Sequence, residues 1–440
     1  MEGTFSMPAS HATLDLDYLH VAFDDPHAVA SAGLLLPATL AERLGIQAAT
    51  NELVRLGGSA SAHAGAKLLT VVHGMLVGGD CIDDVDVLRC AATASVLGHR
   101  VLAPSTVGTF LRAFTFGHTR QLDQVCEQAL THAWTAGAGP GDGPMTIDVD
   151  STIIEVHGHH KQGASYGYTR TLGYHPLVAT RADTGEVLHA RLRAGRANTA
   201  RGMPRFTDEL IARVRRAGAT GELTLRADSG FWSAKTIKTL RRHRVRYSIT
   251  VHKTKLVRAA IAAIDEDAWT DIDYPDTGIA QVAETRLQAD RLIVRRVRHL
   301  TDQGELFPCW DYHAFVTDRV GTAVWLDADH RRHAVVELAI RDLKNGSGLA
   351  HCPSGRFAAN AAWLLAATLA HNLLRWTAIL GLGTRDELTY AKTLRRTLLA
   401  IPGRLTRSAR RWTLHLPVGW PWAHSFTMAL ARLRCIPLAA

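Results

Sequence analysis

Four side chains between residues 327 and 346 have the types and spacing to do acid–base or metal chemistry together. On a helix with 100° per residue, four polar residues fall within about 60° of one another: His330, His333, Glu337 and Lys344. This face of the helix presents the Glu337 carboxylate between the imidazoles of His330 and His333 on one side and the amine of Lys344 on the other. A surface helix whose charged face meets water has the same pattern, so the role of Glu337 depends on partners elsewhere in the chain.

The helix that carries these residues is predicted over 327–346. Asp327 and Asp329 are suitable N-caps and Asn345-Gly346 is a suitable C-cap, which gives a helix of about four turns. Its other face is apolar and is expected to be buried; it consists of Val335, Val336, Ala339, Ile340 and Leu343.

Further candidate carboxylates lie on predicted strands. In 145–157 apolar side chains alternate with polar ones, which predicts a strand that points Asp148 and Asp150 to one face. Another strand, predicted over 222–228, ends at Asp228. If the two strands pair, their aspartates become neighbours, and the helix over 327–346 can bring Glu337 to the same point.

Three carboxylates held together repel one another and raise one another's pKa values unless cations are bound. Oxygen donors in an open site suit Mg²⁺ or Mn²⁺ with several retained waters. Two such ions about 3.5–4 Å apart would activate a water or a 3′-hydroxyl for attack on a phosphodiester. The pattern therefore predicts a two-metal site for Mg²⁺ or Mn²⁺.

The elements around these residues form a recognisable order. Three strands (145–157, 173–180 and 186–193) precede a helix (203–217), a strand (222–228), a helix (233–243) and a fifth strand (246–251). A closing helix is needed to cover the sheet, and 327–344 is the next strong candidate. Residues 252–326 read as short strands, which predicts a small β-rich subdomain beside that helix.

Length and composition describe a soluble globular protein with two or three domains, since 47% of its 440 residues are hydrophobic and 21% are charged. The six cysteines show no C-x-x-C, which favours reduced thiols in a cytosol. The N-terminus lacks a signal-peptide pattern. The longest apolar run, 358–374, is interrupted by Asn360, His371 and Asn372, which predicts a buried helix and no membrane span.

Charge is unevenly placed along the chain, whose net charge is +9. Residues 1–100 carry eleven acidic and five basic side chains, whereas after Glu387 there are nine Lys and Arg and no acidic residue. A basic end usually meets phosphate. Its four large aromatic residues, Trp412, Trp420, Trp422 and Phe426, favour an ordered segment over a solvated tail.

Six segments are predicted. A mainly helical N-terminal domain (1–135, with a short strand at 18–23) precedes a Gly/Pro linker (136–144). The first part of the core (145–251), the insertion (252–326), closing helices (327–381) and a basic C-terminal segment (382–440) follow. Helices at 87–97 and 105–116 have helix-turn-helix proportions, but a plain helical hairpin is an equal alternative.

Several motifs in this order resemble DDE transposases of bacterial insertion sequences, in particular the family numbered 1380 within the larger group numbered 4. The motifs are Asp148-Val-Asp-Ser-Thr152, Lys161-Gln-Gly-Ala-Ser-Tyr-Gly-Tyr168, Gly173-Tyr-His-Pro-Leu177, Arg226-Ala-Asp-Ser-Gly-Phe231 and Glu337 with Lys344. The likeness covers nearly the whole chain, including Phe23-Asp-Asp-Pro26, Gly79-Asp80, Asp83-Asp84 and Pro104-Ser-Thr106.

The resemblance implies an RNase H-like core and cut-and-paste transposition of DNA. Carried over by motif, the metal ligands are Asp150, Asp228 and Glu337, and Lys344 holds transposon-end DNA. Strand geometry alone leaves Asp148 and Asp150 as alternatives. The family's placement of its first aspartate directly before a Ser/Thr pair favours Asp150.

The chain departs from the family at two positions on the closing helix, where His330 and His333 replace Tyr and Arg that contact DNA. Arg331 and Arg332 are expected to supply part of that contact, and His330 and His333 are themselves still expected to contact DNA. Lys161 is expected to contact DNA from a loop that leans over the site. A zinc site at three clustered histidines (His157, His159 and His160) is disfavoured because no Cys or second His pair stands nearby in the sequence.

Three functional hypotheses follow. The first is a DNA strand transferase that acts as a homodimer on inverted-repeat ends and target DNA, associated with the nucleoid in the cytoplasm. The second is a catalytically impaired protein that binds element ends and represses. The third is a metal-dependent nuclease without strand transfer.

Overall fold

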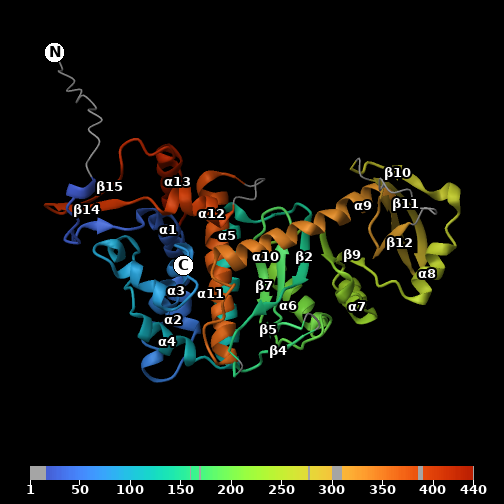
Figure 1. Ribbon diagram of the computed structural model, residues 1–440, viewed down its shortest axis with the longest axis horizontal. Coiled ribbons are helices and arrows are strands. Elements are labelled where there is room, and N and C mark those ends of the chain that lie inside the picture. Colours follow the sequence, from blue (N-terminus) through green and yellow to red (C-terminus); the bar gives the residue numbers. More distant parts are fainter. Residues whose placement is uncertain are drawn as a thin grey trace, which may run out of the picture.

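A mixed β-sheet forms the middle of the molecule and extends to one of its ends (Figure 1). The computed structural model describes residues 16–158, 160–167, 170–275, 278–299, 310–384 and 390–439. Within these ranges the sheet has nine strands in the order β10-β11-β12-β13-β9-β8-β2-β6-β7. Helices from both ends of the chain gather at the other end of the molecule.

Five strands of this sheet match the predicted core. They are β2 (Met145–Ser151), β6 (Leu177–Arg181), β7 (Val187–Arg191), β8 (Leu223–Ala227) and β9 (Arg246–Thr250). β8 pairs in parallel with both β2 and β9, whereas β2 with β6 and β6 with β7 are antiparallel. β6 and β8 are buried along their whole length, as expected for strands covered on both faces.

The second predicted strand, over 173–180, is interrupted at His175-Pro176 and gives two elements. Proline has no N–H to donate to a ladder, which ends the first piece. That piece, β5 (Leu172–Tyr174), joins a separate small sheet with β3 (Ile154–Glu155) and β4 (Ser165–Tyr166).

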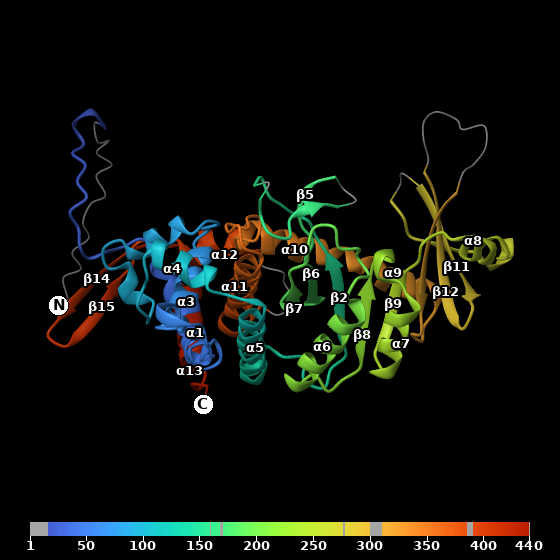
Figure 2. The same cartoon turned by 90° about the horizontal axis from the view of Figure 1, so that it is seen from below.

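Four helices flank the central strands. α6 (Met203–Arg216) and α7 (Ala234–Arg242) connect parallel strands and pack against β7 and β9. α9 (Ala323–Arg331) and α10 (Val335–Gly346) lie in line with each other, and α10 crosses β2 and β6 (Figures 1 and 2). The polar face of β2 therefore lies under α10.

The insertion is β-rich and lies beside α9, as predicted, because α9 contacts β11 and β12. Its described residues contain α8 (Lys255–Ala262) and four strands: β10 (Thr270–Ile272), β11 (Gly278–Leu287), β12 (Asp290–His299) and β13 (Asp311–Thr317). β13 pairs antiparallel with β9, with Phe315 opposite Thr250, so the insertion continues the central sheet. Alternation predicted its strands, but no local pattern specifies which strand is the neighbour of β9.

The N-terminal helices are α1 (Leu35–Arg43), α2 (Ile46–Leu53), α3 (Ala64–Leu76), α4 (Pro104–Arg112) and α5 (Phe116–Ala133). The predicted strand at 18–23 is wrong, because Leu16–Tyr18 is a 3-10 turn and 19–23 have no regular structure. The predicted helix at 87–97 is also wrong. Two 3-10 segments, Asp83–Arg89 and Thr93–Val96, stand in its place, which removes the first helix of a helix-turn-helix.

The Gly/Pro linker does not separate two cores. Trp134–Ala138 follow α5 as a π-helical turn, residues 139–144 form a short turn, and β2 begins at Met145. α11 (Phe357–Trp376) packs against α3 and α5 on one side and β7 on the other, and one hydrophobic core runs from Val29 to Leu433.

The basic C-terminal segment folds back onto the N-terminal helices. It comprises α12 (Ala391–Leu394), β14 (Gly403–Ser408), β15 (Arg411–His415) and α13 (Ala423–Cys435). β14 pairs with β1 (Ala28–Val29), and α13 packs on α1 with Phe426 and Leu433 buried. The two ends of the chain thus form one unit beside the sheet (Figure 1).

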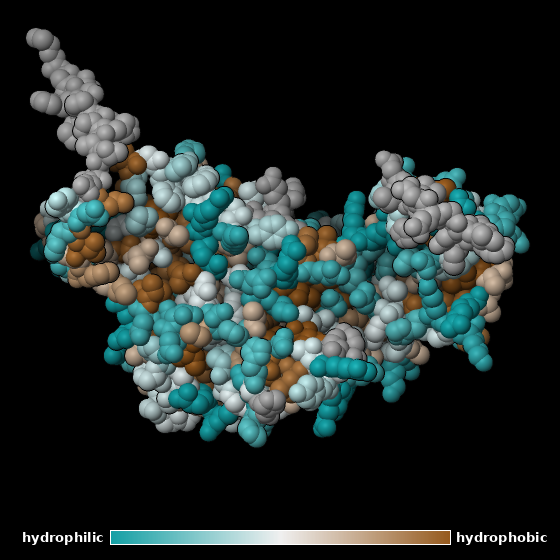
Figure 3. Space-filling model, viewed as in Figure 1, coloured by the Kyte–Doolittle hydropathy of each residue, from teal (hydrophilic) through white to brown (hydrophobic). Residues whose placement is uncertain are grey.

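Among the residues that the structure describes, one helix has the length and composition of a membrane span: α11 with the π-helical turn after it, Phe357–Leu382. The protein itself buries 83% of its most apolar window, and core helices pass the same test. On the face shown in Figure 3, hydrophobic atoms form small patches separated by hydrophilic residues. The helix is therefore weak evidence for a membrane span.

Gly33 offers a test of how firmly the two ends of the chain are joined. A Cβ at this position would lie 1.7 Å from the carbonyl oxygen of Leu398. We expect Gly33→Ala to lower the free energy of unfolding by about 1–3 kcal/mol, the usual cost of overpacking. Urea unfolding measures this; Gly57→Ala, where a Cβ has no neighbour within 4 Å, is the control. Equal losses in both variants would contradict a close contact at Gly33.

Candidate active site

Three elements bring the predicted carboxylates together. Asp150 is near the end of β2, Asp228 directly follows β8, and Glu337 lies in the first turn of α10. β2 and β8 are parallel neighbours with Val149 opposite Ala227, so both strands present their aspartates at the same edge of the sheet. α10 contacts β2, which brings the glutamate to this edge.

An open cavity of about 270 Å³ marks the meeting point. Asp150 and Glu337 both line it, together with Thr152, Ile340, Arg341, Lys344 and Asn345. Asp228 is not a lining residue. Burial raises the pKa of Asp150 to about 6, and the charges of Asp228 and Glu337 add to this rise. The structure therefore places the three residues within electrostatic reach of one another.

The raised pKa of Asp150 makes the stability of the metal-free protein depend on pH. The Asp150 carboxyl holds its proton more tightly in the folded protein, where its pKa is about 6, than in the unfolded chain, where its pKa is near 3.8. Protonated Asp150 therefore stabilises the fold fully below pH 3.8, and this stabilisation is lost as the pH rises through about 6. We expect a loss of about 3 kcal/mol between pH 3 and pH 7. Urea unfolding in EDTA at a series of pH values measures this loss. Asp150→Asn should remove this part of the pH dependence. Parallel curves of unfolding free energy against pH for parent and variant would contradict the raised pKa.

The donor set fits hard divalent cations. Asp228 has a side chain that is 64% exposed, and Glu337 is exposed as well, so both keep carboxylate oxygens accessible to solvent. Oxygen donors that repel one another in an open pocket suit Mg²⁺ or Mn²⁺ that retain waters. The donor types thus suit such ions, while the three carboxylates are not among the groups of described residues whose ligand atoms all lie within 4.8 Å of one another.

Asp148 has a different environment from Asp150, although both share a strand face. Its carboxylate is fully buried and accepts hydrogen bonds from Arg226 Nε at 2.8 Å and Nη2 at 2.9 Å. His333 Nδ1 lies 2.9 Å from the same carboxylate. These contacts leave Asp150 as the aspartate of this strand that faces the cavity.

His333 connects this buried pair to the pocket. Its Nε2 lies 3.8 Å from Asp228 Oδ1 and has no hydrogen-bond partner among the described residues. Burial alone would lower the pKa of His333, but the hydrogen bond and charge of Asp148 outweigh it and raise the pKa. The imidazole therefore lies between Asp148 and a candidate metal ligand, within the protein.

His330 also lies inside the protein. Its ring stacks on Phe315 at 4.0 Å between centroids, and its nitrogens lie 2.8 Å from Ser248 Oγ and 3.0 Å from Thr250 Oγ1. Burial lowers the pKa of His330 to about 3, with the neighbouring charges of His333 and Arg226 acting in the same direction. The expected contact of His330 with DNA would require breaking both hydrogen bonds.

The predicted single helix over 327–346 is corrected by the structure. Its first part starts earlier, because Thr322 is the N-cap of α9 and accepts a bond from Trp325 N–H. Residues 332–334 form a 3-10 turn between α9 and α10. Asp327 is not a cap: it is buried and pairs with Arg331 at 3.0 Å.

Of the other residues predicted to contact DNA, some lie near the carboxylates and some do not. Lys344 lines the cavity but donates to the carbonyl of Ile153 at 2.9 Å, and burial lowers its pKa. Arg332 is exposed. Lys161 donates to the carbonyl of Cys352 and lines a different cavity, so the structure does not bring it to the carboxylates.

The histidines considered for zinc do not form a cluster in the described part of the chain. His157 and His160 are exposed, and His159 lies outside the described residues. Cys309 lies outside them too. The other five cysteines, at 81, 90, 126, 352 and 435, are unpaired.

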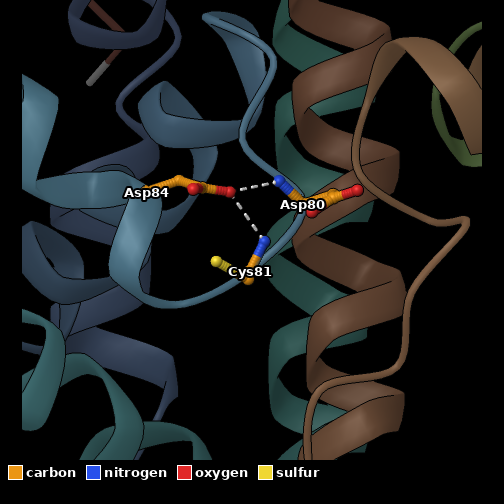
Figure 4. Close-up of side chains that lie close together, drawn as sticks. All are labelled: Asp80, Cys81 and Asp84. Carbon is orange, nitrogen blue, oxygen red and sulfur yellow. Dashed lines mark hydrogen bonds between the residues drawn. The ribbon is translucent and has the colours of Figure 1, made fainter.

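In the described residues, one group of potential ligand atoms lies within 4.8 Å of one another: Asp80, Cys81 and Asp84. Figure 4 shows the Asp84 carboxylate accepting the backbone N–H groups of Asp80 and Cys81, at 2.8 and 2.9 Å. A Cβ at Gly79 would lie 2.8 Å from the Asp84 side chain. These contacts explain the Gly79-Asp80 and Asp83-Asp84 motif as a tight turn.

Two residues of the site were missed by sequence reasoning. Arg226 was quoted within a motif but given no role, and its pairing with Asp148 depends on strand neighbours. Arg341 stands four residues after Glu337, which places it one turn further along the same helix face. The four-residue spacing from Glu337 was the feature of the sequence that could have identified Arg341 as a residue of the site.

A mixed α/β fold that presents two carboxylates in an open pocket, with a third at the end of the next parallel strand, is typical of enzymes that use divalent metal ions on phosphodiesters. Residues 13–438 match the family model described as transposase DDE domain group 1, so the chain belongs to this family of DDE transposases.

Two other comparisons complete this result. A solved structure described as the piggyBac transposase synaptic complex with hairpin DNA is similar, with 11% sequence identity, a TM-score of 0.46, and coverage of 84% of this chain and 79% of that chain. No curated protein matches the sequence.

Proposed function

We propose that this transposase cleaves DNA at the ends of a mobile element and joins the freed 3′-hydroxyl to target DNA, in a cut-and-paste reaction. The observation that carries the proposal is that Asp150 and Glu337 line one open pocket, while Asp228 follows the parallel strand beside that of Asp150. Membership of the DDE transposase family supports it. The resemblance of the motifs to the insertion-sequence family numbered 1380 supports a bacterial mobile element as the source.

The five strands β7-β6-β2-β8-β9 support an RNase H-like core. Their order, with β8 parallel to both neighbours, places the first aspartate on the first strand of the core and the second aspartate after the fourth. The glutamate comes from the helix that crosses these strands. The insertion then extends the core sheet from β9 outward.

Asp150, Asp228 and Glu337 would hold two Mg²⁺ or Mn²⁺ ions. Such ions activate a water or a 3′-hydroxyl and stabilise the leaving oxygen. In the first step, water oxygen bonds to phosphorus as the bond to the 3′-oxygen breaks, and a 3′-hydroxyl is released. In the second, that 3′-oxygen bonds to a target phosphorus, a target phosphorus–oxygen bond breaks, and the hydroxyl proton goes to solvent.

The proposed partner is double-stranded DNA, as inverted-repeat ends and as target, bound by a homodimer. The net charge of +9 favours binding to phosphate. The exposed arginines of the β14–β15 hairpin, Arg404, Arg407, Arg410 and Arg411, are candidates for part of this contact.

A second candidate is a protein that binds element ends and represses without cutting. The internal hydrogen bonds of His330 favour it, because that residue replaces an expected DNA contact. Lys344 is likewise bonded within the chain.

Purified protein, a labelled element end and Mg²⁺ separate these functions. Cleavage with a joined product supports strand transfer, cleavage without joining indicates a nuclease, and a gel shift without cleavage indicates a binding protein. Omitting Mg²⁺ and adding EDTA should stop cleavage. Cleavage that continues in EDTA would contradict the proposed metal site.

A further inference from the structure

A second cavity adjoins the carboxylate pocket and extends it. Its volume is about 500 Å³, and it is lined by Arg341, Asp342, Asn345, Gly346, Tyr390, Lys392, Thr393 and Arg395. Arg341 and Asn345 line both cavities. The two cavities therefore form one trough, which runs along α10 from Asp150 to the start of α12. We call it the α10 trough.

Two cations in the α10 trough are available to a ligand. Arg341 and Lys392 are exposed, and no ion pair or hydrogen bond within the described residues engages either side chain. Glu337 is one turn from Arg341, yet the two do not form an ion pair. Both charges therefore face solvent.

The other charged residues of the second cavity are already engaged. Asp342 is buried, lies 2.9 Å from Arg375 Nη2 and accepts the N–H of Ala391 at 3.0 Å. Arg395 donates to the backbone carbonyls of Leu76 and Gly346, at 2.9 and 2.7 Å. The charge that the described part of this cavity offers to a ligand is therefore positive.

The helix spacing suits a chain of phosphates. Glu337, Arg341 and Asn345 are all exposed and follow one another at four-residue steps, which rise about 6 Å each along the axis. A strand that places one phosphate at the carboxylates can therefore place later phosphates at Arg341 and beyond. Backbone contacts of this kind position DNA without reading its sequence.

We propose that the α10 trough holds the DNA strand next to the scissile phosphate, with Arg341 and Lys392 as its phosphate contacts. This inference rests on the proposed function, because it takes the carboxylate pocket as the place of cleavage. It assigns DNA contact to residues other than His330 and Lys344, whose polar atoms are bonded within the protein. The contact is independent of base sequence.

The test uses the full chain and a labelled duplex of arbitrary sequence. Dissociation constants are measured over a range of KCl for the parent, Arg341→Ala, Lys392→Ala and the double variant. Each lost phosphate contact should reduce the slope of log affinity against log salt by about 0.9 for duplex DNA or about 0.7 for a single strand. The double variant should lose about twice as much.

Lys238→Ala is the matched control. Lys238 is an exposed lysine on α7, away from the trough, and no partner is recorded for it within the described residues. Its slope should equal that of the parent. None of the three substituted side chains has a recorded hydrogen bond or ion pair within the described residues, and thermal unfolding of each of the four variants checks that the fold is kept.

The outcomes separate this inference from the proposed function. If the parent cleaves an element end and the Arg341 and Lys392 variants keep the parent slope, the α10 trough is wrong and the function stands. If the variants lose slope and the parent binds without cleaving, the α10 trough stands as a DNA contact, and both the proposed function and the scissile phosphate beside the trough are wrong. A loss of slope in Lys238→Ala equal to that in Arg341→Ala would also overturn the trough.

Discussion

Asp228→Asn is expected to reduce DNA cleavage by about a thousandfold and to leave DNA binding unchanged. A bound metal ion contributes several kcal/mol of transition-state stabilisation, and each 1.36 kcal/mol is a factor of ten in rate. The side chain is 64% exposed and follows the last residue of β8, so the amide is accommodated without repacking. The loss is therefore expected in the chemical step.

Single-turnover cleavage of a labelled element end in Mg²⁺ measures this effect, with affinity measured in parallel by gel shift. Glu222→Gln is the control, because Glu222 directly precedes the same strand at the opposite end and its side chain is 59% exposed. It should cleave at the parent rate. Cleavage by Asp228→Asn within a few fold of the parent would remove this residue from the proposed metal site.

Local patterns in the sequence were enough to predict the core strands and the carboxylates. Alternation predicted β2 and β8, and the apolar residues Met145, Ile147 and Val149 of β2 are buried as it implies, although Asp148 on the polar face is buried too. Asp228 was placed correctly at the end of its strand. The roles of these residues stay predictions until activity is measured.

Features that depend on long-range pairing were not predicted. The insertion lies beside the closing helix as expected, because α9 contacts β11 and β12. The pairing of β13 with β9, which extends the sheet, was not predicted. The Gly/Pro segment at 136–144 resembles a linker, yet α11 unites the helices before it and the sheet after it. Composition marks turns well, but it does not reveal which surfaces a later helix will cover.

The choice between Asp148 and Asp150 shows the same limit at the level of one site. Both aspartates point to the same face of β2, and alternation cannot distinguish them. The difference lies in Arg226, one strand away, which binds Asp148 and buries its charge. The family resemblance favoured Asp150 because the family's first aspartate stands directly before a Ser/Thr pair, and alternation does not carry that information.

The two histidines that depart from the family pattern have internal roles in this structure. His333 bonds to Asp148, and His330 stacks on Phe315 beneath the junction of α9 and α10. Both hold the closing helix against β2 and the neighbouring strands. Neither imidazole lines the α10 trough, where Arg341 is exposed, so the proposed DNA contact in the trough does not depend on them.

Arg226→Met should destabilise the protein by about 3–5 kcal/mol, the usual cost of leaving a buried charge without its partner. Asp148 is fully buried, and His333 alone would remain beside it. Urea unfolding measures the loss. Arg246→Met, which breaks the exposed pair with Glu222 on the neighbouring strands, should cost less than about 1 kcal/mol.

The double variant Asp148→Leu with Arg226→Met should recover part of the stability lost in Arg226→Met, because it removes the charge that the single variant leaves unpaired. Since Asp148 lies two residues before Asp150 and Arg226 two before Asp228, the same pair aligns the strands that carry both aspartates. Cleavage by the double variant should therefore remain below that of the parent even where stability recovers. Full recovery of both would mean that the buried pair is not needed to position the carboxylates.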